Sequence, residues 1–224
     1  MKKISVKNII EFRKKSEKSK KSFLKSLDKV KPITTETGGN YWVRSVSAMS
    51  KSFKTNDNIH IKEKIEIISN LYEISKSLKT KVMFQRNLNI LLNYENFDFS
   101  TWYPNNAFKI LDKNSRNSII EINSIPVQVL PNQIFSFKSN ETDCVGAVWF
   151  IAKLQRYNEA ELGIFSESLF NLLKVNFSKN YEVMPEYCLI IDVLNVKEVT
   201  YKMILDNKIS ALLQSTLKAI KESR

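Results

Sequence analysis

Apolar residues recur at helical spacing through the first half of the chain. Within residues 5–30 two such groups flank a polar, basic stretch, which predicts either one interrupted helix or two short ones. Similar apolar stripes predict helices over residues 41–54, 60–78 and 80–93. Residues 34–40 include two adjacent glycines and predict a turn or flexible loop. The front half is therefore predicted to be mostly helical.

Beyond Pro104 the pattern changes to one typical of β-strands mixed with helices. The predicted strands are residues 119–122, 126–130, 134–137, 145–154 and 187–194, and the predicted helices are residues 158–175 and 206–222. We therefore predict an α+β fold with two regions, a basic and mainly helical region (1–103) and a mixed α/β domain (104–224). The second region should contain a small sheet of about four to five strands flanked by helices.

The apolar runs are too short to cross a membrane. A spanning helix needs roughly 18–20 apolar residues, whereas the longest runs, Ala147–Ala152 and Tyr187–Leu194, have the length of strands. The first residues are basic, but the continuous apolar segment of a signal peptide does not follow them. These patterns predict a cytoplasmic protein without a membrane partner.

Positive charge is concentrated at the front of the chain. The net charge is +12, and residues 1–31 hold 12 Lys or Arg against 3 acidic residues. Residues 130–224 hold equal numbers of basic and acidic residues. Closely spaced lysines suit an extended polyanion, because each can neutralise a phosphate and release its counterions. One alternative is a solvated helix face that binds nothing specific. A membrane-surface helix is a weaker alternative, because the basic stretch lacks the large apolar face that anchors such helices.

The leading hypothesis is a nucleic-acid-binding protein whose basic N-terminal helical segment contacts the phosphate backbone with little sequence specificity. The candidate contact residues are Arg13, Lys14, Lys15, Lys18, Lys20, Lys21, Lys25, Arg44, Lys51, Lys54 and Arg86.

Motifs for cofactor or metal chemistry are scarce. Cys144 and Cys188 lie in or beside apolar strands, where a free cysteine usually behaves as a small buried hydrophobe. His60 is the single histidine and lies at a predicted helix start, which favours an ordinary surface or capping role. The chain has no Gly-x-Ser-x-Gly, Walker or Gly-x-Gly-x-x-Gly motif. We therefore predict no catalytic residues, metal or cofactor for the leading hypothesis.

The predicted order of helix 80–93, three β runs, helix 158–175 and strand 187–194 is similar to the core order of the PD-(D/E)XK nucleases. The resemblance implies a metal-dependent nuclease in which an acid near the second strand and a D/E-x-K motif on the third bind Mg²⁺ and activate water. Lys153 matches the lysine of that motif, but Ile151 occupies the position of the expected acid. Asn132 replaces the aspartate of the upstream Pro-Asp pair. On this alternative the catalytic candidates, including a displaced set of acids, are Glu121, Asp143, Lys153 and Asp192.

An aromatic segment, residues 93–102, suggests either a packed loop or a protein-binding surface, and core packing is the favoured interpretation. Exposed rings there would support a third hypothesis, a subunit of a bacterial mobile-element or phage-defence assembly. Such a subunit would have a protein partner or would form a homo-oligomer.

Overall fold

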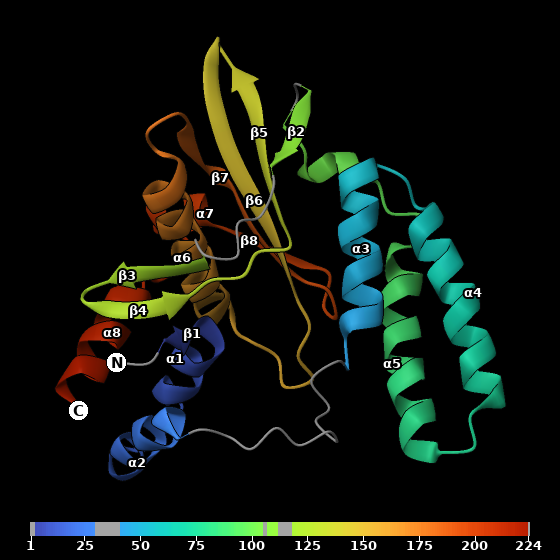
Figure 1. Cartoon of the computed structure of the whole chain (residues 1–224), viewed down its shortest axis with the longest axis horizontal. Helices are drawn as coiled ribbons and strands as arrows, with labels where there is room; N and C mark the ends of the chain where they lie inside the picture. The colour runs from blue at the N-terminus through green and yellow to red at the C-terminus, as the bar shows by residue number, and fades with distance from the viewer. Residues whose placement is uncertain (1–2, 30–40, 105–106, 112–117, 224) are drawn as a thin grey trace.

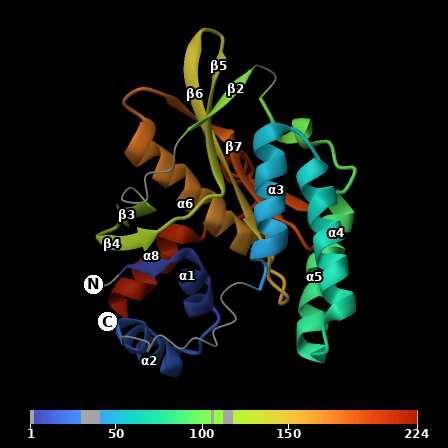
Figure 2. The same ribbon diagram turned by 45° about the vertical axis from the view of Figure 1, so that its right-hand side comes forward.

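A five-stranded mixed sheet with helices on both faces organises the molecule (Figures 1 and 2). The computed structural model describes residues 3–29, 41–104, 107–111 and 118–223, so the loop predicted at 34–40 lies outside the described residues. The sheet has the order β2-β5-β6-β7-β8. Its strands are β2 (Phe108–Leu111), β5 (Gln133–Ser139), β6 (Thr142–Ile151), β7 (Glu182–Asp192) and β8 (Lys197–Thr200).

A second, three-stranded sheet has the order β1-β4-β3. Its strands are β1 (Ile4–Ser5), β3 (Ile119–Ile122) and β4 (Ile125–Gln128). The helices are α1 (Val6–Arg13), α2 (Glu17–Asp28), α3 (Val43–Thr55), α4 (Ile59–Ile74), α5 (Leu78–Tyr94), α6 (Glu159–Phe177), α7 (Tyr201–Leu205) and α8 (Leu213–Glu222), together with the 3-10 turn η1 (Phe99–Trp102). The α+β prediction is confirmed, including a helical front half and a sheet flanked by helices.

Strands β6 and β7 are parallel and are joined through α6, whereas β5 and β6 form an antiparallel hairpin. Helix α6 begins with a capping box, in which the Asn158 side chain accepts from the Glu161 N–H at 2.8 Å and the Glu161 carboxylate accepts from the Asn158 N–H at 3.1 Å. Because β6 and β7 run in the same direction, their carboxyl ends lie side by side, with Ile151 opposite Asp192.

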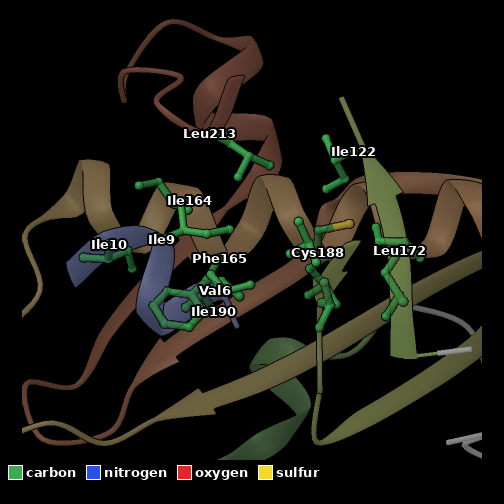
Figure 3. Close-up of a cluster of buried hydrophobic side chains, with 14 of the residues drawn as sticks. Val6, Ile9, Ile10, Ile122, Ile164, Phe165, Leu172, Cys188, Ile190 and Leu213 are labelled. Carbon is green, nitrogen blue, oxygen red and sulfur yellow. The ribbon is translucent and has the colours of Figure 1, made fainter. Parts of the chain in front are cut away.

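Helix α1 packs into the core on the same face of the sheet as α6 and α8. Ser5 caps α1 by accepting from the Asn8 N–H at 3.3 Å. Its buried Ile9 and Ile10 join one hydrophobic cluster with Phe165 of α6 and Ile190 of β7 (Figure 3). The first part of the basic N-terminal segment is therefore structural as well as charged.

Helices α3, α4 and α5 cover the opposite face, where aromatic rings fill a second cluster. The Phe53 ring contacts those of Phe135 and Phe150, with centroids 5.7 and 6.3 Å apart. Phe99 and Trp102 are also buried in this cluster. The core-packing interpretation of the aromatic segment 93–102 therefore agrees with the structure, and the protein-partner hypothesis loses the exposed rings on which it rested.

The structure also bears on the cysteines and on membrane spans. Cys144 and Cys188 are both buried and free. Within the described residues, no helix is long and apolar enough to cross a membrane. Division into residues 1–103 and 104–224 as separate units stays a prediction, and side chains from both regions share each hydrophobic cluster.

Candidate functional site

A groove of about 1150 Å³ opens between α1, the start of α3 and the segment that follows β6. We call it the basic groove. Its lining residues are Lys7, Glu11, Tyr41, Trp42, Val43, Val46, Ser47, Ser50, Lys51, Leu130, Asn132, Trp149, Phe150, Ile151, Ala152, Lys153, Leu154, Gln155 and Tyr157. Segments distant in the sequence thus meet at the ends of β6 and its neighbours.

Among the described residues, three lysines reach this groove from three different segments. Lys7 belongs to α1, Lys51 to α3, and Lys153 follows the last residue of β6 by two positions. Glu11 is the one acidic residue among the described lining residues, and it shares a face of α1 with Lys7 because the two are four positions apart. The burial of Ile9 and Ile10 on another face of α1 fixes which face meets the groove. These ionisable groups leave the groove net positive.

Glu11 and Lys153 form an ion pair with 2.5 Å between Oε1 and Nζ. Donation from Lys153 lowers the pKa of the Glu11 carboxyl, and the charges of Lys153, Lys14 and Lys15 add to this effect against a smaller opposing effect of burial. Lys153 Nζ also lies 4.3 Å from the centroid of the Tyr157 ring. Burial, followed by the negative charges of Glu11 and Glu161, raises the pKa of the Tyr157 hydroxyl.

This ion pair predicts a pH dependence of stability. Because folding lowers the pKa of Glu11 below its ordinary 4.5, the pair stabilises the fold above that pH and loses its contribution as the pH falls through the folded-state pKa. The pair is partly exposed, so we expect Glu11→Gln to lower the free energy of unfolding at pH 7 by about 1 kcal/mol or less. The difference from the original protein should shrink below pH 4.5. Urea unfolding over a pH series measures both quantities.

Glu17→Gln is the matched control, because Glu17 pairs with Lys20 within α2 and its side chain is 85% exposed. It should leave the acid limb of the stability curve almost unchanged. If the free energy of unfolding falls with pH in the same way in Glu11→Gln and in the original protein, the assigned role of the pair is contradicted.

The predicted contact residues of α2 fall into two groups. Lys18, Lys21 and Lys25 are exposed, and their spacing of three and four positions places them on one face of the helix. Lys20 instead pairs with Glu17 at 2.5 Å. Leu24 is the buried residue of α2 and lies one turn after the half-buried Lys20. The helix therefore presents one row of lysines to solvent.

The basic residues at the end of α1 and just after it have intramolecular contacts. Lys14 forms an ion pair with Glu161 at 2.9 Å, and Arg13 donates to the Thr216 hydroxyl at 3.1 Å. Lys15 Nζ lies 5.6 Å from the centroid of the Phe23 ring. Lys14 and Arg13 thus help to hold α1 against α6 and α8.

The remaining predicted contacts lie on α3 and α5. Lys54 is exposed at the end of α3, one turn beyond Lys51. Arg44 lies over the Phe84 ring at 5.4 Å. Arg86 donates to the Tyr41 hydroxyl at 2.9 Å. Lys51 is therefore the residue of this set that lines the basic groove.

The structure does not bring the four nuclease candidates together. Glu121 lies on β3 of the smaller sheet and is exposed. Asp143 lies near the start of β6, ten positions and roughly 30 Å of strand from Lys153. Asp192 is buried at the end of β7, where its carboxylate accepts from the N–H groups of Leu194 and Asn195 at 3.1 and 3.3 Å. A shared catalytic centre of these residues is therefore not formed.

The element order expected from the nuclease resemblance is matched in part: α5, β5, β6, α6 and β7 follow one another, but the predicted strands 119–122 and 126–130 form β3 and β4 of the smaller sheet, and the unpredicted β2 pairs with β5 instead. The residues at the positions of the nuclease motif do not form a metal site. The Asn132 amide oxygen accepts from the Phe150 N–H at 2.8 Å, Ile151 is buried, and Lys153 pairs with Glu11. An amide engaged with the backbone and a hydrocarbon side chain do not suit Mg²⁺, which prefers carboxylate oxygens and water. Across the described part of the chain, no group of three or more His, Cys, Asp or Glu side chains is placed to hold a metal ion.

Sequence reasoning missed Lys7, Glu11 and the groove-lining Trp42. Lys7 and Glu11 are spaced to share a helix face, but the contact between Glu11 and Lys153 joins positions 142 residues apart. Such a contact depends on the packing of α1 against α6, which no local pattern specifies.

Comparison of the chain with models of protein families, with curated proteins and with solved structures gives no match.

Proposed function

We propose that the protein binds nucleic acid, with the basic groove as the central contact surface. The observation that carries this proposal is the convergence of Lys7, Lys51 and Lys153 on one groove. Lysines that are fixed on separate segments around a hollow can contact successive phosphates of one strand. The groove volume of about 1150 Å³ leaves room for a segment of a polymer.

The exposed lysines of α2 extend the positive surface beyond the groove. Within the described residues, Lys18, Lys21 and Lys25 form no ion pair, and they share one helix face. Lys14 lies between the two sites, 5.5 Å from the centroid of the groove-lining Tyr157 ring. We infer that a bound strand leaves the groove past Lys14 toward α2. Contacts of this kind recognise phosphate and give little sequence specificity.

Binding is the function that this geometry supports best. The end of β6 presents a lysine paired with a carboxylate and an amide engaged with the backbone, rather than a set of carboxylates. A step that breaks a phosphodiester bond through a metal therefore forms no part of the proposal. The bound polymer is expected to be released intact.

Substitution of the α2 lysines tests the proposal without disturbing the core. Deleting residues 1–31 would remove α1 altogether, and with it Ile9, Ile10 and Phe12 of the hydrophobic cluster. The triple change Lys18→Ala, Lys21→Ala and Lys25→Ala removes only exposed charge. We expect it to weaken binding of labelled DNA or RNA and to flatten the slope of log K against log salt by about 2 to 3. Fluorescence anisotropy across a salt series measures both.

The matched control removes three exposed lysines at the other side of the molecule, through Lys62→Ala, Lys76→Ala and Lys79→Ala on and between α4 and α5. Both triple variants lower the net charge by the same amount. An equal loss in both would indicate a general charge effect and contradict a local surface on α2. Failure of the original protein to bind any nucleic acid at moderate salt would contradict the proposed function itself.

A further inference from the structure

The basic groove carries exposed apolar surface as well as charge. Val43, Leu130 and Leu154 line it with 52%, 53% and 54% of their surface exposed. The half-buried Trp42 and Trp149 also line it. Large apolar side chains that gather in one hollow mark a binding surface more strongly than single ones scattered over a protein. A ligand that matches the groove therefore presents negative charges and apolar faces along the same length of chain.

Buried hydrogen bonds hold the start of α3, and with it Trp42, against α5. Asn87 is fully buried, and its amide oxygen accepts from the N–H and the hydroxyl of Ser45 at 3.2 and 2.9 Å. Its amide nitrogen donates to the Tyr41 carbonyl at 2.8 Å. The Tyr41 ring meets the Trp42 ring edge to face, with centroids 4.7 Å apart. The aromatic surface of the groove is thus positioned before a ligand arrives, which lowers the ordering cost of binding.

We propose that the ligand of the basic groove is single-stranded nucleic acid, an inference that rests on the proposed function. Its unpaired bases pack on Trp42 and the neighbouring aliphatic side chains, and its phosphates pair with Lys7 and Lys51. Every base has a π face, so this packing selects for unpaired strands rather than for a sequence. A duplex hides those faces in its own stack and offers phosphates and base edges, so it would use the lysines and leave the apolar wall uncovered.

Binding of a labelled single strand and of the matching duplex tests the inference. Oligo(dT) of about 12 nucleotides, within the range of known single-strand sites, is compared by fluorescence anisotropy with the same strand annealed to oligo(dA). We expect the single strand to bind at least about tenfold more tightly. Trp42→Ala should weaken single-strand binding by roughly tenfold or more, because stacking on one aromatic ring contributes about that much. Trp42→Phe retains a ring and should retain most of the affinity.

A second variant keeps the test valid if Trp42→Ala unfolds. Leu130 and Leu154 are exposed, so the double change Leu130→Ser and Leu154→Ser should leave the melting temperature nearly unchanged. It should also weaken binding of the single strand more than binding of the duplex. Equal binding of single strand and duplex, with no effect of either variant on their ratio, would overturn the inference while leaving phosphate binding intact.

Two other outcomes separate the inference from its premise. If neither form of DNA nor oligo(U) binds, the proposed function fails and the inference fails with it. If a poly-glutamate peptide with interspersed leucines displaces oligo(dT) at similar concentrations, the groove is a site for acidic, apolar peptides, and the assignment to nucleic acid is overturned.

Discussion

Replacing Lys7 and Lys51 together by glutamate is expected to weaken oligonucleotide binding by about a hundredfold at moderate salt. Each lysine lost removes a charge-assisted contact worth about 1.5 kcal/mol or more, and each glutamate gained repels the same phosphate. The slope of log K against log salt should fall by about 2. Both side chains are exposed, so the melting temperature should change little. Anisotropy titrations at several salt concentrations measure the affinity and the slope.

The control for this double variant is Lys62→Glu with Lys79→Glu, two exposed positions on α4 and α5. Both double variants reduce the net charge by four, from +12 to +8. A general loss of positive charge would weaken binding equally in the two proteins. Retention of affinity in the Lys7 and Lys51 variant would instead remove the basic groove from the binding surface, whatever α2 contributes.

The helices of the front half could be predicted because each one carries a periodic apolar stripe. The stripe over 60–78 corresponds to α4 (Ile59–Ile74) and that over 80–93 to α5 (Leu78–Tyr94). The last helix was predicted from 206 and begins only at Leu213. Asn207 has a φ of 57°, a left-handed conformation that a helix interior does not accept. Residues 206–212 are not helical and separate α7 from α8, so the helix begins about two turns later than predicted.

Membership of the sheets could not be predicted, because strand pairing is decided by distant partners. Residues 119–122 and 126–130 were expected in one sheet with the later strands, yet β3 and β4 form a tight hairpin of their own. Asn123 and Ser124 both have positive φ in this turn, at 51° and 63°, which fits a two-residue hairpin loop. The edge of the main sheet beside β5 is instead formed by β2, which was not predicted.

Two strands of the main sheet were missed for identifiable reasons. Phe108–Leu111 is only four residues long and is recognisable as β2 chiefly through its pairing with β5. Lys197–Thr200 contains two charged residues in four, a composition more typical of a loop, yet it pairs with β7 as β8. Short edge strands of this kind depend on a neighbour for their hydrogen bonds. The sequence pattern alone carries too little information to find them.

The site was predicted only in part for a similar reason. The excess of lysine in residues 1–31 pointed to the front of the chain, where α2 exposes three lysines. The groove itself depends on α1 packing beside the end of β6, which brings Lys7 near Lys153. Whether these residues bind nucleic acid stays a prediction. The sequence pattern does not show that these residues lie close together.

Replacing Gly146 by alanine is expected to cause a large loss of stability although it adds a single methyl group. Gly146 lies in the middle of β6, where the register with β7 shifts between Val145 and Ala147. A Cβ added there would lie 2.6 Å from the Tyr187 Cβ and 2.9 Å from the Tyr187 carbonyl oxygen. Strands pair on both sides of β6, so neither backbone can retreat without loss of hydrogen bonds. We expect a loss of about 3 kcal/mol in the free energy of unfolding.

Gly163→Ala is the matched control, because it adds the same methyl group at a buried glycine of α6. Its nearest neighbours would be the side-chain carbons of Ile209 and Ile204, at 3.2 and 3.4 Å, which can shift by small rotations. Alanine is also favoured over glycine in a helix interior by about 1 kcal/mol, so the two effects should nearly cancel. Urea unfolding of the three proteins gives the comparison. Equal stability of Gly146→Ala and the original protein would mean that β6 and β7 pair differently near Tyr187, and the position of Lys153 at the end of β6 would need to be redetermined.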